Sequence, residues 1–198
     1  MTEAAGDTLT WRADPLIWGR GPRTFEAFLE PTCPYSAKAF PKLAELLSAA
    51  GEDRLTVKVR LLSQPWHLFS GIVSRAILAA STTEGGREAA RRVMAAVYVN
   101  RDEFEFTHHC SGANMDETPN GILARIEAKS GVRVTEAFAI PDLDREIKWH
   151  TRYARQNGVH VTPTFMIDGT IRPELSSGDP VGRWLDSLVL DDPASVPR

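Results

Sequence analysis

The feature that most constrains the fold is a long run of helical periodicity between two groups of strand-like segments. From Trp66 to about Gly158, apolar residues recur at spacings of three and four, the period of helices that bury one face. Before this run, residues 24–30 and 55–62 are short, rich in aliphatic and β-branched residues, and bounded by turn residues, which is typical of strands. The chain therefore predicts helices that interrupt a sheet.

A helix is expected directly after the first strand, beginning near Cys33 and ending at Gly51. After the helical run, Asp168-Gly169 joins two short apolar segments and favours a two-residue hairpin. A parallel crossover early and an antiparallel hairpin late predict an α/β fold, with a mixed sheet and an all-helical insertion. We expect residues 1–64 and 158–198 to form the sheet domain and residues 65–157 the insertion.

Composition narrows the partners and the compartment. The chain of 198 residues has a formal charge of −3, which argues against a protein built to neutralise nucleic-acid phosphates or to coat an anionic membrane. Its first twenty residues carry three acids and no apolar run of the kind a secretory signal needs, and no stretch is apolar enough to span a bilayer. We therefore expect a cytoplasmic protein in which Cys33 and Cys110 are free thiols rather than a structural disulfide.

Residues 30–36, Glu-Pro-Thr-Cys-Pro-Tyr-Ser, are the segment richest in potential chemistry. A cysteine at the start of a helix faces free backbone N–H groups and the positive end of the helix dipole, and both favour the nucleophilic thiolate. Pro34 suits a first helical turn, Ser36 is placed to donate its hydroxyl to the thiolate, and Tyr35 is expected beside the sulfur. The alternative is that Cys33 is a small buried hydrophobe and Ser36 a residue of the helix start.

The pairing of Cys33-Pro34-Tyr35-Ser36 with Thr162-Pro163-Thr164-Phe165 before a later strand resembles the thioredoxin superfamily. The helical block between the two motifs is similar to that of the DsbA-like branch, and Pro41, eight positions after Cys33, is similar to the proline of thioredoxin's active-site helix. The resemblance covers about residues 24–190 and implies a thioredoxin-like fold and a thiol-disulfide oxidoreductase. It implies that Cys33 attacks disulfides, that Pro163 is cis beside the sulfur, and that the backbone of Thr162 pairs with an extended substrate.

The chain departs from the DsbA-like pattern at Ser36, where those enzymes have a second cysteine that resolves the mixed disulfide. Glutathione could resolve it instead, as a co-substrate; Cys110 could act as a distant resolving thiol; or Cys33 could activate a thiol cofactor. The motif also resembles the start of kappa-class glutathione transferases and 2-hydroxychromene-2-carboxylate isomerases, which have serine at the first position. A monothiol or glutathione-linked oxidoreductase without a bound cofactor is the leading hypothesis. The alternatives are such a transferase or isomerase and a non-catalytic peptide-binding module.

Other candidate residues are given structural interpretations. Residues 106–110 carry two histidines and a cysteine, but adjacent residues rarely point the same way, so no metal site is expected. His67 could tune the thiolate or act as a base, although a capping or packing role is favoured. His150, on an apolar stripe, is expected to be a hydrogen-bonded core residue. The basic face of Arg87, Arg91 and Arg92 is expected to be solvated, with an anion site for glutathione carboxylates as the alternative.

Overall fold

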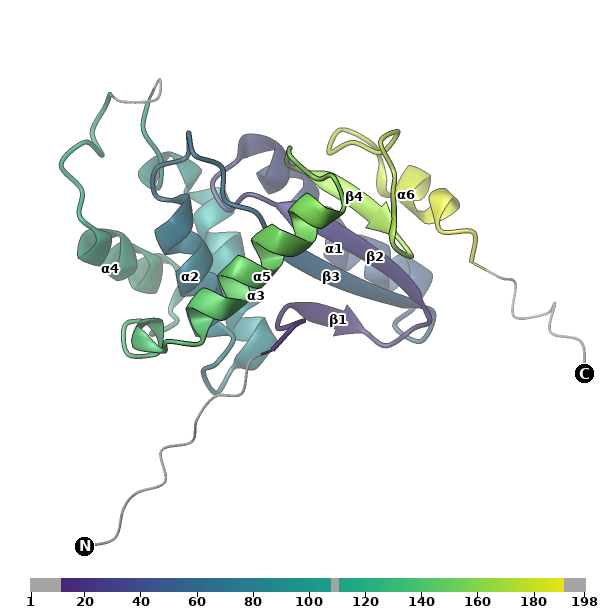
Figure 1. Cartoon of the computed structure of the whole chain (residues 1–198), viewed down its shortest axis with the longest axis horizontal. Coiled ribbons are helices and arrows are strands. Elements are labelled where there is room, and N and C mark those ends of the chain that lie inside the picture. The colour runs from purple at the N-terminus through teal and green to yellow at the C-terminus, as the bar shows by residue number, and fades with distance from the viewer. Residues whose placement is uncertain (1–11, 108–110, 191–198) are drawn as a thin grey trace, which may run out of the picture.

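A mixed sheet of five strands organises the fold in the computed structural model, which describes residues 12–107 and 111–190 (Figure 1). β2 and β3 are parallel, and the other three pairs of neighbouring strands are antiparallel. This confirms the predicted mixed sheet. The strands lie in the order β1-β3-β2-β4-β5, with bounds Ile17–Gly19 (β1), Arg23–Leu29 (β2), Leu55–Leu61 (β3), Thr164–Ile167 (β4) and Thr170–Ile171 (β5).

The turn between β4 and β5 is the predicted hairpin. Asp168 and Gly169 have φ of 46° and 80°, and a two-residue hairpin turn of the primed type needs positive φ at both positions. β1, in contrast, has no counterpart among the predicted strands. It has three residues, ends in Gly19 and pairs along one edge of β3, so it is too short to show an alternating pattern.

Both faces of the sheet are covered. Phe25 on β2 packs against Trp184 of α6 (Val181–Ser187), with ring centroids 5.5 Å apart, on the same face as α1 (Pro34–Ala50). Phe28, on the opposite face of β2, stacks at 6.0 Å on Tyr153 of α5 (Leu143–Gln156). Two buried faces explain why the apolar alternation of this strand is imperfect in the sequence.

The remaining helices lie between β3 and β4 in the sequence. They are α2 (Ser70–Ala80), α3 (Gly86–Val99), η1 (Arg101–Glu103), α4 (Pro119–Ser130) and η2 (Ala137–Ala139). α3 packs against α2 and α4, and α5 contacts both α2 and β3, so that α5 runs across the front of the sheet in Figure 1. Among the described residues, no helix combines the length and apolar character needed to cross a bilayer.

His150 ties α5 to the sheet, which confirms its predicted core position. The backbone N–H of Leu61 donates a hydrogen bond to His150 Nδ1 at 3.0 Å, and the side chain is buried. Burial, reinforced by the nearby Arg60 guanidinium, lowers the pKa of His150 from 6.5 to about 3. The imidazole is therefore neutral at physiological pH.

Candidate active site

Cys33 lies at the start of α1, where β2 has just ended. It is the residue before the first helical turn, with Pro34 at the first helical position, and its carbonyl accepts a hydrogen bond from the N–H of Ala37 at 2.9 Å. Its side chain is buried, with 6% of the residue exposed. The predicted placement of a cysteine at a strand-to-helix turn is confirmed, and free backbone N–H groups at this helix end lie beside it.

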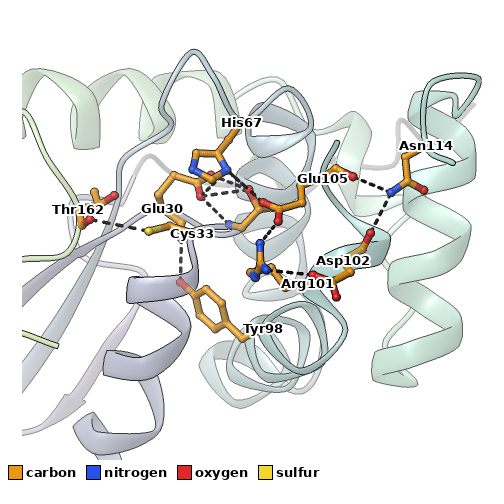
Figure 2. A network of polar contacts seen from close by, with 10 residues as sticks. Glu30, Cys33, His67, Tyr98, Arg101, Asp102, Glu105, Asn114 and Thr162 are labelled. Atoms are coloured by element: carbon orange, nitrogen blue, oxygen red, sulfur yellow. Dashed lines mark hydrogen bonds and ion pairs between the residues drawn. The ribbon is translucent and has the colours of Figure 1, made fainter. Parts of the chain in front are cut away.

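The loop before β4 brings a second chain segment to Cys33. The Thr162–Pro163 peptide bond is cis, as the resemblance implies. The Cys33 thiol donates to the carbonyl oxygen of Thr162, with Sγ and O 3.8 Å apart, although the residues are 129 positions apart in the sequence. Figure 2 shows this contact at the edge of a larger polar network.

A pocket of about 520 Å³ opens over the sulfur. Four of the predicted site residues line it together with six others, contributed by the start of α1, the segment after β3, the segment around η1 and the loop before β4. The lining residues are Cys33, Pro34, Tyr35, Trp66, His67, Arg101, Glu105, Phe106, Val161 and Thr162.

Large apolar side chains are exposed around this pocket. Tyr35, Trp66 and Val161 are 59%, 56% and 66% exposed. Exposed apolar groups that gather at a concave site mark a binding surface more often than scattered ones do. The rim therefore suits a ligand with apolar groups next to its reactive atom.

Ser36 is fully buried, and its hydroxyl is used by the turn itself. Its Oγ accepts a hydrogen bond from the backbone N–H of Glu30 at 3.1 Å. The predicted hydrogen bond from Ser36 to the sulfur of Cys33 is not found in the described part of the chain. Ser36 thus stabilises the strand-to-helix turn through this hydrogen bond.

A buried carboxyl group lies behind the nucleophile. Glu30 directly follows β2 and accepts hydrogen bonds from the backbone N–H of Thr32 at 2.8 Å and from its hydroxyl at 3.1 Å. The Thr32 hydroxyl oxygen lies 2.9 Å from His67 Nδ1, and that nitrogen is 3.6 Å from a carboxylate oxygen of Glu30 (Figure 2). These contacts connect Glu30 to a histidine that lines the pocket.

Burial sets the protonation of this network. The pKa of Glu30 is raised from 4.5 to about 7 by burial, against the opposing effect of hydrogen bonds that include those from Thr32. Tyr98, whose hydroxyl donates to the Glu30 carbonyl at 3.3 Å, has its pKa raised by burial and by the charges of Glu30 and Cys33. Glu30 therefore exchanges a proton near neutral pH.

A second carboxylate approaches His67 from the segment after η1. Glu105 lies 3.6 Å from His67 Nδ1 and is ion-paired with Arg101, which also contacts Asp102 at 2.9 Å. Arg101 is the one arginine or lysine among the residues that line the pocket in the described part of the chain. Its positive charge is already matched by neighbouring carboxylates.

Several candidates lie elsewhere. Cys110, with His108 and His109, falls outside the described residues, and within residues 12–107 and 111–190 no group of three metal-ligating side chains is found. Arg91 and Arg92 line a separate cavity of about 820 Å³ beside α1 and β3, rather than the pocket over Cys33. The basic face of α3 thus supplies no anion site at the sulfur.

The sequence interpretation gave no role to Glu30, Arg101, Glu105, Phe106 or Val161. The sequence does contain one signal for Glu30, which is an acidic residue directly after a strongly apolar strand. That position allows either a buried or a solvated side chain, and only the fold decides between them. The approach of residues 101–106 to the segment after β3 has no local signal, because tertiary packing alone brings them together.

The fold and the site define a class of protein. A cysteine directly before the helix that follows a central strand, opposite a cis proline that precedes the strand paired with that central strand, is the arrangement of thioredoxin-fold thiol proteins. The helices between β3 and β4 give the fold its DsbA-like form.

Comparison with known proteins agrees with this assignment to the thioredoxin fold. A sequence profile described as thioredoxin matches residues 20–187, and the chain therefore belongs to the thioredoxin family. A Pseudomonas syringae protein described as a candidate protein-disulfide isomerase is 61% identical, with a TM-score of 0.87 over 88% of this chain and 98% of that one. No curated protein matches the chain significantly.

More distant structures share the fold. Pseudomonas aeruginosa DsbA2 is 20% identical, with a TM-score of 0.59 over 92% of this chain and 100% of that one. The thiol-disulfide exchange protein α-DsbA2 of Wolbachia pipientis is 16% identical, with a TM-score of 0.64 over 88% of this chain and 85% of that one. These likenesses support the predicted DsbA-like architecture.

Proposed function

We propose that this protein is a monothiol thiol-disulfide oxidoreductase that uses Cys33 as its nucleophile and takes its second thiol from solution. The observation that carries the proposal is the position of the Cys33 sulfur, at a helix start and 3.8 Å from the carbonyl beside a cis proline, with a pocket open above it. A helix start favours the thiolate that attacks disulfides, and the pocket gives a substrate access to the sulfur.

The exchange has two steps. The Cys33 thiolate attacks one sulfur of a substrate disulfide, the Cys33–S bond forms, and the other sulfur leaves as a thiol after taking up a proton. A small thiol such as glutathione then attacks the mixed disulfide and restores Cys33. The residue at position 36 is serine and is buried against Glu30, so it cannot supply the resolving sulfur.

The substrates we propose are disulfides with apolar groups next to the sulfur. The exposed rings of Tyr35 and Trp66 and the side chain of Val161 surround the opening. The single lining arginine, Arg101, is engaged by Glu105 and Asp102, so the pocket offers little to the two carboxylates of glutathione. Glutathione then acts as a diffusing co-substrate rather than a tightly held cofactor, as suits a cytoplasmic protein in a thiol-rich compartment.

Intact mass measurement tests this proposal. The purified, reduced protein is exposed briefly to oxidised glutathione and compared with the Cys33→Ser and Cys110→Ser variants. One glutathione retained on Cys33, and removed by reduced glutathione, is the expected result. Loss of two hydrogens without an adduct, abolished by either substitution, would instead make Cys110 the resolving thiol.

The remaining outcome separates the other functions. If Cys33 does not react with oxidised glutathione at neutral pH, the oxidoreductase proposal fails. Saturable binding of reduced glutathione without any disulfide would then indicate a transferase or isomerase of the kappa-class type. Binding of extended peptides without glutathione binding would indicate a non-catalytic module.

A further inference from the structure

A continuous chain of polar contacts runs from the buried carboxyl behind Cys33 to the wall of the pocket. Glu30 is fully buried, Thr32 is fully buried, and His67 reaches the surface with 12% of its side chain exposed. The distances along this chain are 3.1 Å from Glu30 Oε2 to Thr32 Oγ1 and 2.9 Å from Thr32 Oγ1 to His67 Nδ1. Both are ordinary hydrogen-bond lengths.

The single hydroxyl hydrogen of Thr32 gives this chain two directions. When Glu30 is ionised, the hydroxyl donates to the carboxylate and accepts from His67 Nδ1–H. When Glu30 is protonated, the carboxyl donates to Thr32 Oγ1 and the hydroxyl donates to His67 Nδ1. Reversal of both hydrogen bonds moves one proton between the buried carboxyl and the pocket without movement of a heavy atom.

We propose that Glu30, Thr32 and His67 form a proton relay that holds a proton behind the nucleophile and delivers it to the sulfur that leaves the substrate disulfide. The proposal rests on the proposed exchange reaction at Cys33. His67 lines the pocket beside Cys33 and would be the group that meets the departing sulfur. Glu30 and Thr32 act through His67 and are positioning residues.

The proton balance of the exchange closes with this relay. In the first step the Cys33 thiolate forms a bond to one substrate sulfur, and the electron pair of the broken S–S bond stays on the other sulfur, which takes the proton from His67. Glu30 then returns a proton to His67 through the Thr32 hydroxyl. In the second step the attacking thiol gives its proton to His67 Nε2 as it forms its bond to sulfur, and Cys33 leaves as the thiolate. The proton on His67 Nδ1 returns through the Thr32 hydroxyl to Glu30, which restores the starting state.

The charged and titratable groups that surround the relay come from three parts of the chain. Glu105 follows η1 and lies 3.6 Å from His67 Nδ1, while Arg101 pairs with that carboxylate. Tyr98 of α3 contacts the backbone of Glu30, and Cys33 opens α1. An ionised Glu30 would oppose the thiolate of Cys33, and a proton held on the relay is available to the departing sulfur. A proton that resides on the relay therefore supports both the nucleophile and the leaving group.

Varying the leaving group tests the relay, because a purely structural role of Thr32 would affect all disulfides equally. Single-turnover reaction of reduced protein is followed with hydroxyethyl disulfide, whose departing alkyl thiolate needs a proton, and with an aromatic disulfide, whose thiolate is stable without one. We expect Thr32→Val to lower the ratio of the alkyl rate to the aromatic rate by roughly tenfold or more. Thr32→Ser keeps the hydroxyl and should restore the ratio.

Three results would overturn the relay. An unchanged ratio in Thr32→Val, or an equal loss of both rates, would show that Thr32 acts on the structure of the turn alone. If the wild-type protein reacts with neither disulfide at Cys33, the proposed function itself fails. The aromatic disulfide separates this outcome from failure of the relay alone, because it reacts at Cys33 without needing a proton. If Thr32→Val does not fold, Glu30→Gln and His67→Gln carry the same expectation, together with the loss of the near-neutral inflection in the pH profile of the alkyl reaction.

Discussion

His150 should make the stability of this protein fall in acid by an amount that can be worked from the structure. Its pKa is about 3 in the folded state and 6.5 in an unfolded chain, because burial excludes the imidazolium. Between these values the unfolded state binds more protons, so the free energy of unfolding falls as the pH falls. From pH 8 to pH 5 the loss is about 1.5 pH units of 1.36 kcal/mol, or about 2 kcal/mol.

Wild-type protein alone cannot show this effect, because Glu30 titrates in the opposite sense. The pKa of Glu30 is higher in the folded state, so protonation of Glu30 stabilises the fold as the pH falls through about 7. The variant His150→Asn isolates the histidine. Its amide oxygen can accept the Leu61 N–H that His150 Nδ1 accepts at 3.0 Å, and it does not titrate.

The assay is urea unfolding followed by tryptophan fluorescence at pH 8 and pH 5, with exposed His160→Asn as the matched control. As the pH falls from 8 to 5, we expect the free energy of unfolding of His150→Asn to rise by about 2 kcal/mol relative to that of wild type. This change does not depend on any pH-independent cost of the substitution. The control should show no pH-dependent difference. An equal response of His150→Asn and wild type would refute the reasoning, because it would mean that the folded protein accepts the proton on His150.

Three further predictions concern the buried acid, the pocket rim and the core ion pair. As the pH rises from 4.5 to 8, the free energy of unfolding of Glu30→Gln, measured in urea, should rise by about 3 kcal/mol relative to that of wild type. The reason is that the wild-type carboxyl, with a folded pKa of about 7, loses its proton in this range; a pH-independent difference would contradict this. Trp66→Ala should lower kcat/KM for disulfide peptides with aromatic flanks about tenfold and leave hydroxyethyl disulfide nearly unaffected, and equal losses would count against an apolar subsite. Arg60→Met should lower the free energy of unfolding by about 3 kcal/mol in urea, because the buried Glu26 carboxylate, 2.7 Å from the guanidinium, would lose its counter-charge and keep, among the described residues, only the hydrogen bond from the Tyr153 hydroxyl. A cost below about 1 kcal/mol would show that this hydrogen bond is sufficient for Glu26.

The elements that pack the core could be predicted from the sequence because the helices repeat their apolar residues with a definite period and the two long strands are short apolar runs bounded by turn residues. The expected strands at residues 24–30 and 55–62 correspond to β2 and β3, and the expected helix from Cys33 to Gly51 corresponds to α1. β1 could not be predicted, because its three residues are held by pairing with β3 rather than by their own pattern.

The site was predictable in its covalent chemistry and not in its electrostatics. The cysteine and the loop of Thr162 and Pro163 were expected together only through resemblance to a family, since no local rule connects residues 129 positions apart. The proton-binding group of the site, Glu30, depends on full burial, which is a property of the assembled fold. The role of Cys110 stays a prediction, because that residue lies outside the described part of the chain.

Ser36 links the structure of the turn to the proposed single-thiol chemistry. Its hydroxyl oxygen satisfies the backbone N–H of Glu30, while the Glu30 carboxylate satisfies the backbone N–H of Thr32, so the turn that presents Cys33 is held by two side-chain oxygens. A cysteine at position 36 would offer sulfur, a weak acceptor, to a buried N–H. The same turn would then lose a hydrogen bond next to the carboxyl of the proposed proton relay. Serine at this position thus fits a site in which the second sulfur comes from a co-substrate and the protein contributes the nucleophile, the apolar rim and the proton.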